Sequence, residues 1–233
     1  EERKVLAELS ALVAEEASAL NQVVAVLRTL DLALARGRYG RWLGGVEPQL
    51  EPAAEAPFRF SGLRHPLLVW QHKRADGSPV VPISVEVSPE LRVVAITGPN
   101  TGGKTVTLKS IGLAALMARA GMLLPCSGQP SLPWCAQVLA DIGDEQSLQQ
   151  SLSTFSGHVK RIGRILEALQ RGSAPALVLL DEVGAGTDPS EGTALATALL
   201  KALADRARLT IATTHFGELK ALKYDDARFE NAS

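Results

Sequence analysis

The stretch Gly98-Pro-Asn-Thr-Gly-Gly-Lys104-Thr105 follows the pattern G-x-x-x-x-G-K-[ST], in which a glycine-rich loop surrounds phosphate groups. A short apolar run rich in β-branched residues, 91–96, precedes it. A segment with apolar residues at helical spacing, 106–119, follows it. Strand, glycine loop and helix is the order that this motif requires. The stretch therefore predicts a phosphate-binding loop (P-loop) in a protein of the α/β class.

The residue types of this stretch suit phosphate chemistry. Glycines let the backbone curl until successive N–H groups point at phosphate oxygens, and the helix that follows adds its positive end. Lys104 is expected to reach the β- and γ-phosphates, and the hydroxyl of Thr105 is expected to ligate Mg²⁺. The residues expected to contact the nucleotide are Gly98, Pro99, Asn100, Thr101, Gly102, Gly103, Lys104, Thr105 and Val106.

The composition is that of a globular protein. The chain has 233 residues, 46% of them hydrophobic, which is enough for a substantial core and excludes disorder. With 24 basic and 25 acidic residues the net charge is −1, so no overall positive field attracts nucleic acid. Two cysteines, Cys126 and Cys135, are too few for a disulfide framework and match no zinc-site spacing. Both are expected to be buried thiols.

The chain shows no targeting signal. No run of eighteen apolar residues is present, and the charged first residues lack the apolar stretch of a signal peptide. A cytoplasmic protein without membrane contact is expected. The first residue is not Met and the first helical segment starts without a cap, so a piece of a longer protein is expected.

The N-terminal part is predicted to be helical. Between residues 6 and 34 apolar side chains recur at spacings of three and four, with Glu16 as the only break in the stripe. A helix this long either docks on the flank of the domain or acts as a mobile lever. Residues 36–40 are expected to end it, and residues 47–57 read as a connector rich in proline, alanine and glutamate. The predicted units are a helical segment, 1–56, and an ATPase-type domain, 57–233.

The rest of the chain alternates strands and helices. Residues 58–68 and 80–87 are predicted to form an antiparallel platform, and 122–133 a crossover rich in proline and glycine. Further strands are expected at 136–142, 176–180 and 209–214, with helices at 106–119, 159–169 and 194–204. Ser153 or Thr154 is expected to cap the second of these helices. This order predicts a mostly parallel sheet with its ligand at the carboxyl ends of the strands.

Three polar side chains follow two of the predicted strands. Asp181 ends an apolar run, where a carboxylate can hold the Mg²⁺ of a nucleotide, and Glu182 next to it can orient or deprotonate the attacking water. His215 ends the next strand and is placed to sense the γ-phosphate through a hydrogen bond. The glycine-rich loop 184–192 is expected to face a partner, near a second nucleotide site. His65, His72 and His158 carry no assignment.

Four motifs together are similar to those of one family. They are GPNTGGKT at 98–105, SLSTFSGH at 151–158, LLDEVGAGTDPSEG at 179–192 and TTH at 213–215. This set resembles the ATPase domain of MutS-family proteins, which are ABC-class ATPases. GAGTDPSEG and SLSTFSGH resemble the bacterial and plastid paralogue branch that often ends in a Smr nuclease domain. The resemblance covers residues 58–233 well and residues 1–50 more loosely, as the helical region returning from the lever and clamp.

The resemblance implies ATP and Mg²⁺ as ligands and a homodimer with composite sites, in which Ser153 of one subunit reaches the nucleotide of the other. It also implies that regions outside this chain grip branched or mismatched DNA, or act at stalled ribosomes, in the cytoplasm or a plastid stroma. Val80 and Val81 align with a Phe-Ile pair that packs on adenine in MutS relatives. Because Val80 replaces the Phe, looser base selectivity is expected.

Two other interpretations of the motifs are an ABC-class ATPase of another lineage and a module that uses ATP as a structural clamp with negligible turnover. The absence of an LSGGQ-type signature argues against the first, and Glu182 argues against the second. The chain alone, cut from its dimerising and DNA-binding parts, is expected to be a weakly active monomer.

Overall fold

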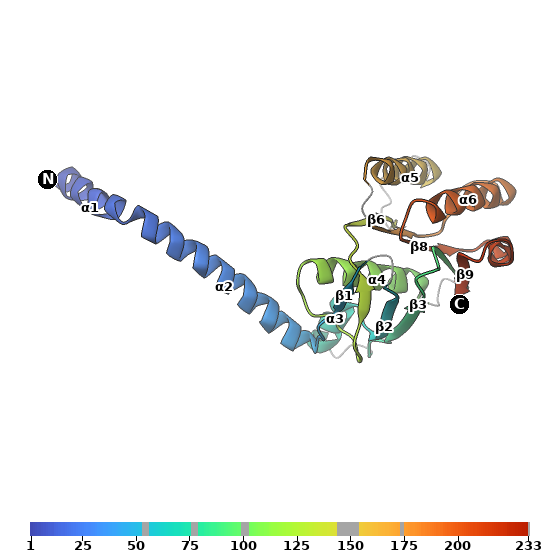
Figure 1. Cartoon of the computed structure of the whole chain (residues 1–233), viewed down its shortest axis with the longest axis horizontal. Helices are drawn as coiled ribbons and strands as arrows, with labels where there is room; N and C mark the ends of the chain where they lie inside the picture. The colour runs from blue at the N-terminus through green and yellow to red at the C-terminus, as the bar shows by residue number, and fades with distance from the viewer. Residues whose placement is uncertain (53–55, 76–78, 99–102, 144–153, 173–174, 233) are drawn as a thin grey trace.

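The larger of two sheets has five strands that all run parallel to their neighbours. The computed structural model describes residues 1–52, 56–75, 79–98, 103–143, 154–172 and 175–232. In the five-stranded sheet the order is β6-β7-β8-β4-β9, and Figure 1 labels three of these strands, β6, β8 and β9. The strands are β4 (Val93–Thr97), β6 (Gln137–Asp141), β7 (Ala176–Leu180), β8 (Leu209–Thr214) and β9 (Phe229–Ala232). The predicted parallel α/β sheet is confirmed, and β9 is a strand that the sequence had not indicated.

The smaller sheet has four strands in the order β1-β5-β2-β3. They are β1 (Gln49–Glu51), β2 (Phe58–Leu63), β3 (Ile83–Val87) and β5 (Ser131–Pro133). The β2–β3 pair is antiparallel, which confirms the predicted platform, whereas β1 and β5 run parallel. The supposed crossover therefore ends in a strand of this sheet.

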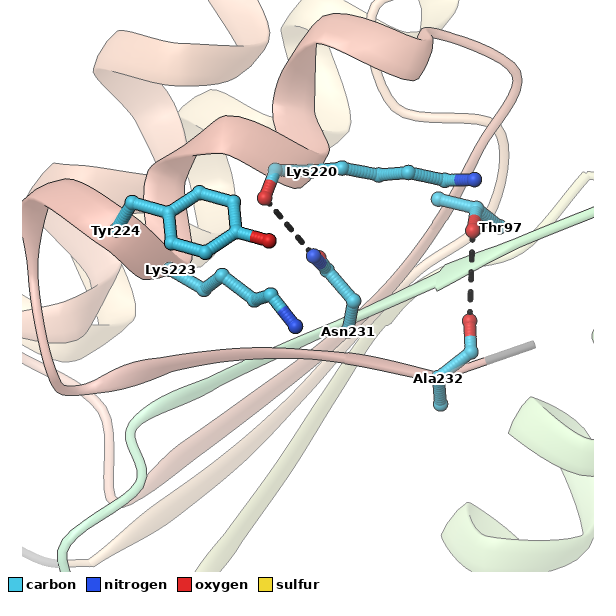
Figure 2. Close-up of a pocket in the computed structure, with 6 residues that line it drawn as sticks. All are labelled: Thr97, Lys220, Lys223, Tyr224, Asn231 and Ala232. Carbon is cyan, nitrogen blue, oxygen red and sulfur yellow. Dashed lines mark hydrogen bonds between the residues drawn. The ribbon is translucent and has the colours of Figure 1, made fainter.

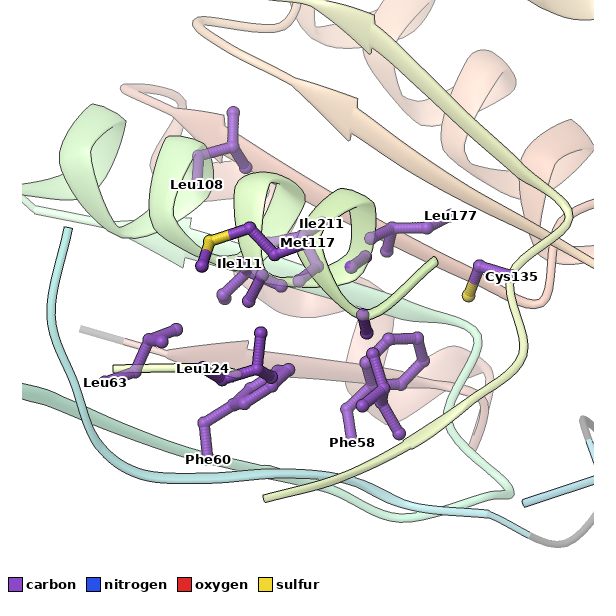
Figure 3. Close-up of a cluster of buried hydrophobic side chains, with 14 of the residues drawn as sticks. Phe58, Phe60, Leu63, Leu108, Ile111, Met117, Leu124, Cys135, Leu177 and Ile211 are labelled. Carbon is purple, nitrogen blue, oxygen red and sulfur yellow. The ribbon is translucent and has the colours of Figure 1, made fainter. Parts of the chain in front are cut away.

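The main hydrophobic core lies around α4 (Lys104–Arg119), between the two sheets (Figure 3). Phe58 and Phe60 of β2 are fully buried there against Leu108 and Ile111 of α4. Helix and large sheet approach closely at Gly112, where an added Cβ would lie 2.4 Å from a methyl carbon of a β7 leucine. The helix that follows the P-loop is therefore held by apolar packing on both sides.

Two further helices pack on the five-stranded sheet. They are α5 (Thr154–Arg171) and α6 (Pro189–Ala204), and with β7 and β8 they bury a second cluster of apolar side chains that includes Ile165 and Leu200. Helix α6 begins five residues before the predicted start, because Asp188 caps it by accepting hydrogen bonds from the amides of Ser190 and Glu191.

The structure has helices in two segments where none was predicted, and the long strand predicted in the first of them was wrong. The strand predicted over 58–68 ends at Leu63, and a helix, α3 (Pro66–Ala75), begins at the proline, which is well suited to a first helical position. The segment after β8 folds into a 3₁₀ helix, η2 (Gly217–Ala221), and a short helix, α7 (Leu222–Asp225).

The N-terminal helix is broken once and runs further than predicted. Helix α1 (Glu2–Glu15) and helix α2 (Ala17–Leu43) meet at Glu16, the break in the apolar stripe. The predicted end at 36–40 was wrong, because α2 continues to Gly44, whose φ of 66° ends the helix. Both helices extend away from the two sheets (Figure 1), and their large apolar side chains up to Leu34 are exposed, whereas Leu43 at the base of α2 is buried in the main core.

By length and composition alone, α2 is apolar enough to cross a membrane. An 18-residue window of it reaches a mean hydropathy of 1.2, and none of that window is buried. Arg28 and Asp31 lie near the middle of the helix, where each charge would cost about 2.5–3.5 kcal/mol at the centre of a bilayer. The helix is therefore weak evidence for a membrane span.

Candidate functional site

The predicted site residues gather at one edge of the five-stranded sheet. Strands β7, β8 and β4 are neighbours, and their register pairs Leu180 with Ala212 and Thr97 with Thr214. Because the strands are parallel, their carboxyl ends lie side by side at the same edge. The P-loop follows β4, the two acidic residues follow β7, and His215 follows β8.

Lys104 is a buried cation at the first turn of α4. Its side chain is 5% exposed, and its Nζ donates a hydrogen bond to the carbonyl oxygen of Gly98. The residue before it, Gly103, has φ of 77°, a backbone conformation that favours glycine. Among the residues that the structure describes, no acidic side chain forms an ion pair with this buried ammonium group, and phosphate oxygens would supply a negative charge beside it. The arrangement fits the phosphates of a nucleotide.

The structure describes only some of the other residues predicted to contact the nucleotide. Val106, on the first turn of α4, is 41% exposed. Among the predicted nucleotide-contacting residues, five lie outside the described residues: Pro99, Asn100, Thr101, Gly102 and Ser153. Their assignments stay predictions.

Asp181 is the centre of a small hydrogen-bond network. Its Oδ1 accepts from the hydroxyl of Thr105 at 3.2 Å and from the hydroxyl of Thr213 at 2.5 Å. The Thr213 hydroxyl oxygen in turn accepts from the amide of Glu182 at 2.8 Å. Asp181 is 6% exposed and Thr213 is fully buried. One buried hydroxyl therefore holds both predicted acidic residues in place.

The Thr105 and Asp181 oxygens suit Mg²⁺. Two neighbouring ligands of an octahedral Mg²⁺ with bonds of about 2.1 Å lie roughly 3 Å apart, close to the 3.2 Å between these oxygens. Within the described ranges no cluster of three or more His, Cys, Asp or Glu side chains could hold a metal. Phosphate oxygens and waters would have to complete the shell, as is usual for Mg²⁺ bound with a nucleotide.

Glu182 and His215 face each other at the same edge. The Glu182 Oε1 lies 3.1 Å from the His215 Nε2, and the two side chains are 28% and 42% exposed. A carboxylate can only accept, so the imidazole donates this hydrogen bond. Glu182 has φ of 51°, the only positive φ of a non-glycine residue in the described part of the chain. Such a conformation costs of order 1–3 kcal/mol and is typical of functional sites.

The loop after Glu182 is packed tightly on the start of α6. An added Cβ at Gly184, whose φ is 83°, would lie 2.6 Å from the carbonyl oxygen of Gly192 and 2.8 Å from the ring of Phe216. Two glycines are therefore needed where the loop closes on the helix. That this loop faces a partner stays a prediction.

Two cavities border the P-loop and share Thr97 and Ala232 in their linings. The larger, of about 390 Å³, lies between β3 and α4 and reaches Gly98 and Lys104. The smaller, of about 220 Å³, is lined by Thr97, Lys220, Lys223, Tyr224, Asn231 and Ala232 (Figure 2). In it the Asn231 amide donates to the carbonyl oxygen of Lys220 at 2.9 Å.

The proposed adenine contacts, Val80 and Val81, differ in exposure. Val80 is partly buried against the main core, and Val81 is 81% exposed. Ile83 and Ser84, which follow them, line the larger cavity. Contact of the two valines with a base stays a prediction.

The sequence analysis did not predict a second cluster of polar side chains. His158, which had no assignment, lies with its Nδ1 2.6 Å from Oδ2 of Asp141, and Arg161 Nε donates to the other oxygen of the same carboxylate. Asp141 is the last residue of β6, and Asp181 is the first residue after β7, so an acidic residue near the end of a predicted strand was the signal. The Thr213 hydroxyl was also missed, because a threonine inside a buried apolar strand carries no comparable signal.

Comparison with known proteins agrees with this geometry. The family model for MutS domain V matches residues 94–233, more than half of the chain. The chain is 57% identical to Endonuclease MutS2 of Synechocystis sp., covering all of this chain and 30% of that protein. It is 49% identical to Endonuclease MutS2 of Symbiobacterium thermophilum, covering all of this chain and 28% of that protein. The chain spans less than a third of the length of these curated relatives. With its P-loop, its strand-ending Asp181-Glu182 pair and its parallel sheet, the chain belongs to the MutS domain V family, whose fold is that of an ABC-like P-loop ATPase.

Proposed function

We propose that this chain binds ATP with Mg²⁺ and hydrolyses it, as the motor domain of a MutS-like DNA-binding protein. The observation that carries the proposal is the convergence of Lys104, Thr105, Asp181, Glu182 and His215 at one sheet edge. A buried cation, a pair of Mg²⁺-type oxygens and a carboxylate held by an imidazole are the parts that phosphoryl transfer to water requires.

Each side chain has a separate task. Lys104 binds the β- and γ-phosphates, and Thr105 with Asp181 holds Mg²⁺. The ion, when bound, neutralises charge on the phosphate oxygens. Glu182 orients the attacking water or takes its proton, a role that contributes typically 10²–10⁴-fold to the rate. His215 fixes the carboxylate through the 3.1 Å hydrogen bond and lies where it can respond to the γ-phosphate.

The proposed site is completed by a second copy of the chain. Ser153, which directly precedes α5 in the sequence, would reach the nucleotide of the partner, since a helix N-terminus is a good site for phosphate. The loop 184–192 would lie at the same junction. ATP binding then closes the dimer and hydrolysis reopens it.

The nucleic-acid target is proposed to be gripped elsewhere. The net charge of −1 offers no basic field for DNA on this chain. We propose that regions outside it bind branched or mismatched DNA, or act at stalled ribosomes, and that the protein works in the cytoplasm, or in the plastid stroma of a plant.

The test is ATP turnover measured against protein concentration, with the oligomeric state followed by light scattering. Wild-type specific activity should rise with concentration. The variant Glu182→Gln should lower kcat by about 100-fold or more and accumulate an ATP-bound dimer. Glu218→Gln is the matched control, because Glu218 is an exposed glutamate of η2 close in sequence to His215. It should leave kcat unchanged.

Two results would contradict the proposal. If ATP binds but neither turnover nor dimerisation is seen at any concentration, the chain is a binding module that uses ATP as a clamp. If Glu182→Gln and Glu218→Gln lower kcat equally, Glu182 has no special role in hydrolysis.

A further inference from the structure

Asp141 holds the first turns of α5 with its carboxylate. Its side chain is 3% exposed, and each of its two oxygens meets one donor. Oδ2 lies 2.6 Å from Nδ1 of His158, and Oδ1 accepts from Nε of Arg161. His158 and Arg161 are three residues apart in α5 and so lie on the same face of the helix.

The same residue is also joined to the strand that carries Asp181. Strand β6 pairs in parallel with β7, and the carbonyl oxygen of Asp141 accepts a hydrogen bond of 2.8 Å from the amide of Asp181. Asp141 therefore contacts the Mg²⁺-binding strand with its backbone and α5 with its side chain.

The two halves of α5 are anchored differently. Ile165 and Leu169, in the second half, are buried in the apolar cluster shared with β7 and α6. In the first half Ile162 is only partly buried against that cluster, and the polar contact with the sheet is made by the buried carboxylate of Asp141. Removing that carboxylate would keep the apolar packing of the second half, whereas His158 and Arg161 on the first half would both lose their acceptor on the sheet.

We propose that Asp141 is a positioning residue that fixes the first half of α5 to the edge of the sheet beside Asp181, and so sets the orientation in which this helix meets the nucleotide of a partner subunit. The functional part of this proposal rests on the proposed function, in which the start of α5 contacts the nucleotide bound by the partner subunit. In this role the carboxylate of Asp141 acts through His158 and Arg161.

The structural part is tested by hydrogen–deuterium exchange of the whole chain with Asp141→Asn. Asparagine keeps the shape but places an NH₂ group against one of the two donors. Amides 158–162 of α5 should exchange about tenfold faster or more, since local opening governs exchange. Amides 166–171 and those of α4 should keep their rates. Arg161→Gln should produce the same pattern.

The matched control for this measurement is Arg164→Gln, which removes a guanidinium group from an exposed position of the same helix. It should leave exchange unchanged. Equal protection in Asp141→Asn and wild type would overturn the proposal, and so would a loss of protection spread over the whole chain.

The functional part is tested by mixing variants. Asp141→Asn should bind ATP within about twofold of wild type but lose about tenfold in kcat, because its own P-loop is intact while the helix offered to the partner is displaced. Lys104→Ala should be inactive. In a 1:1 mixture half of the dimers are mixed and each has one intact site of two, so about a quarter of wild-type activity should return.

The outcomes separate the two proposals. Absence of any rescue would mean that Asp141 acts on the P-loop of its own subunit, and the trans role would be wrong. If the wild-type chain neither turns over ATP nor dimerises, the proposed function fails, whereas the exchange pattern still decides whether Asp141 positions α5.

Discussion

Replacing Thr213 with valine removes one hydroxyl group while keeping the volume of a fully buried side chain. That hydroxyl donates to Asp181 at 2.5 Å and accepts from the amide of Glu182 at 2.8 Å. A hydrogen bond to a charged group is worth about 1.5–3 kcal/mol, and leaving a buried N–H unpaired costs about 1–3 kcal/mol. Because Glu182 is partly exposed, water can compensate in part. We expect Thr213→Val to lower the free energy of unfolding by about 2–4 kcal/mol.

Thr210 is the matched control on the same strand. It is equally buried, but its hydroxyl oxygen has no hydrogen-bond partner among the described residues. An unpaired buried hydroxyl is unfavourable, so Thr210→Val should be neutral or should raise the free energy of unfolding by about 1 kcal/mol.

The assay is urea unfolding followed by far-UV circular dichroism without nucleotide. The midpoint of Thr213→Val should fall and that of Thr210→Val should stay or rise, with unchanged m-values. If Thr213→Val unfolds at the wild-type midpoint, or if both variants are equally destabilised, the Thr213 hydroxyl does not hold the two acidic residues and our account of the site is wrong.

Three further outcomes are expected. Gly192→Ala should lower the free energy of unfolding by about 1–3 kcal/mol, because its Cβ would lie 2.4 Å from the carbonyl oxygen of Gly184. The control Gly163→Ala, which adds a methyl group into open space on a helix, should raise the free energy of unfolding by about 0.5–1 kcal/mol. Urea unfolding of the two variants measures both changes. The hydrogen bond from the Arg228 guanidinium lowers the pKa of Asp226 to about 2, so this carboxylate stabilises the folded state fully above pH 4 and loses that effect as pH falls towards 2. In thermal unfolding at acid pH, Asp226→Asn should not show this part of the loss of stability. If the variant and wild type lose stability in the same way, the reasoning is wrong. Burial raises the pKa of both Cys126 and Cys135 to about 11, so iodoacetamide at pH 8 should label them, by mass spectrometry, only after unfolding.

The sequence was sufficient to predict those site residues that directly follow a strand. Continuous apolar runs gave β7 and β8 with their observed bounds, and the side chains that follow, Asp181, Glu182 and His215, meet at one edge because parallel strands end together. The P-loop was recognisable because few residue types allow its backbone conformation.

What sequence reasoning missed depends on tertiary contacts. The α3 helix begins at Pro66, and only Arg64 and His65 separate it from the end of β2, so the apolar residues on both sides were read as one longer strand. The role of Thr213 and the cluster around Asp141 arise only when residues some 20 to 30 positions apart meet. Short strands such as β5 and β9 form because a neighbouring edge is available, which no local pattern reveals.

The base of the long helix α2 rests on the residues that follow the P-loop helix. An added Cβ at Gly40 would lie 2.6 Å from Leu123, and Val46 exchanges two backbone hydrogen bonds of 2.8 Å with Leu124. The 27 residues of α2 extend about 40 Å. A rotation of about 10° at this contact would therefore carry the far end of α2 through roughly 7 Å, since displacement grows with distance from the pivot. A movement of α4 on phosphate binding would then be enlarged along α2, with α4 as the short arm of a lever and α2 as its long arm.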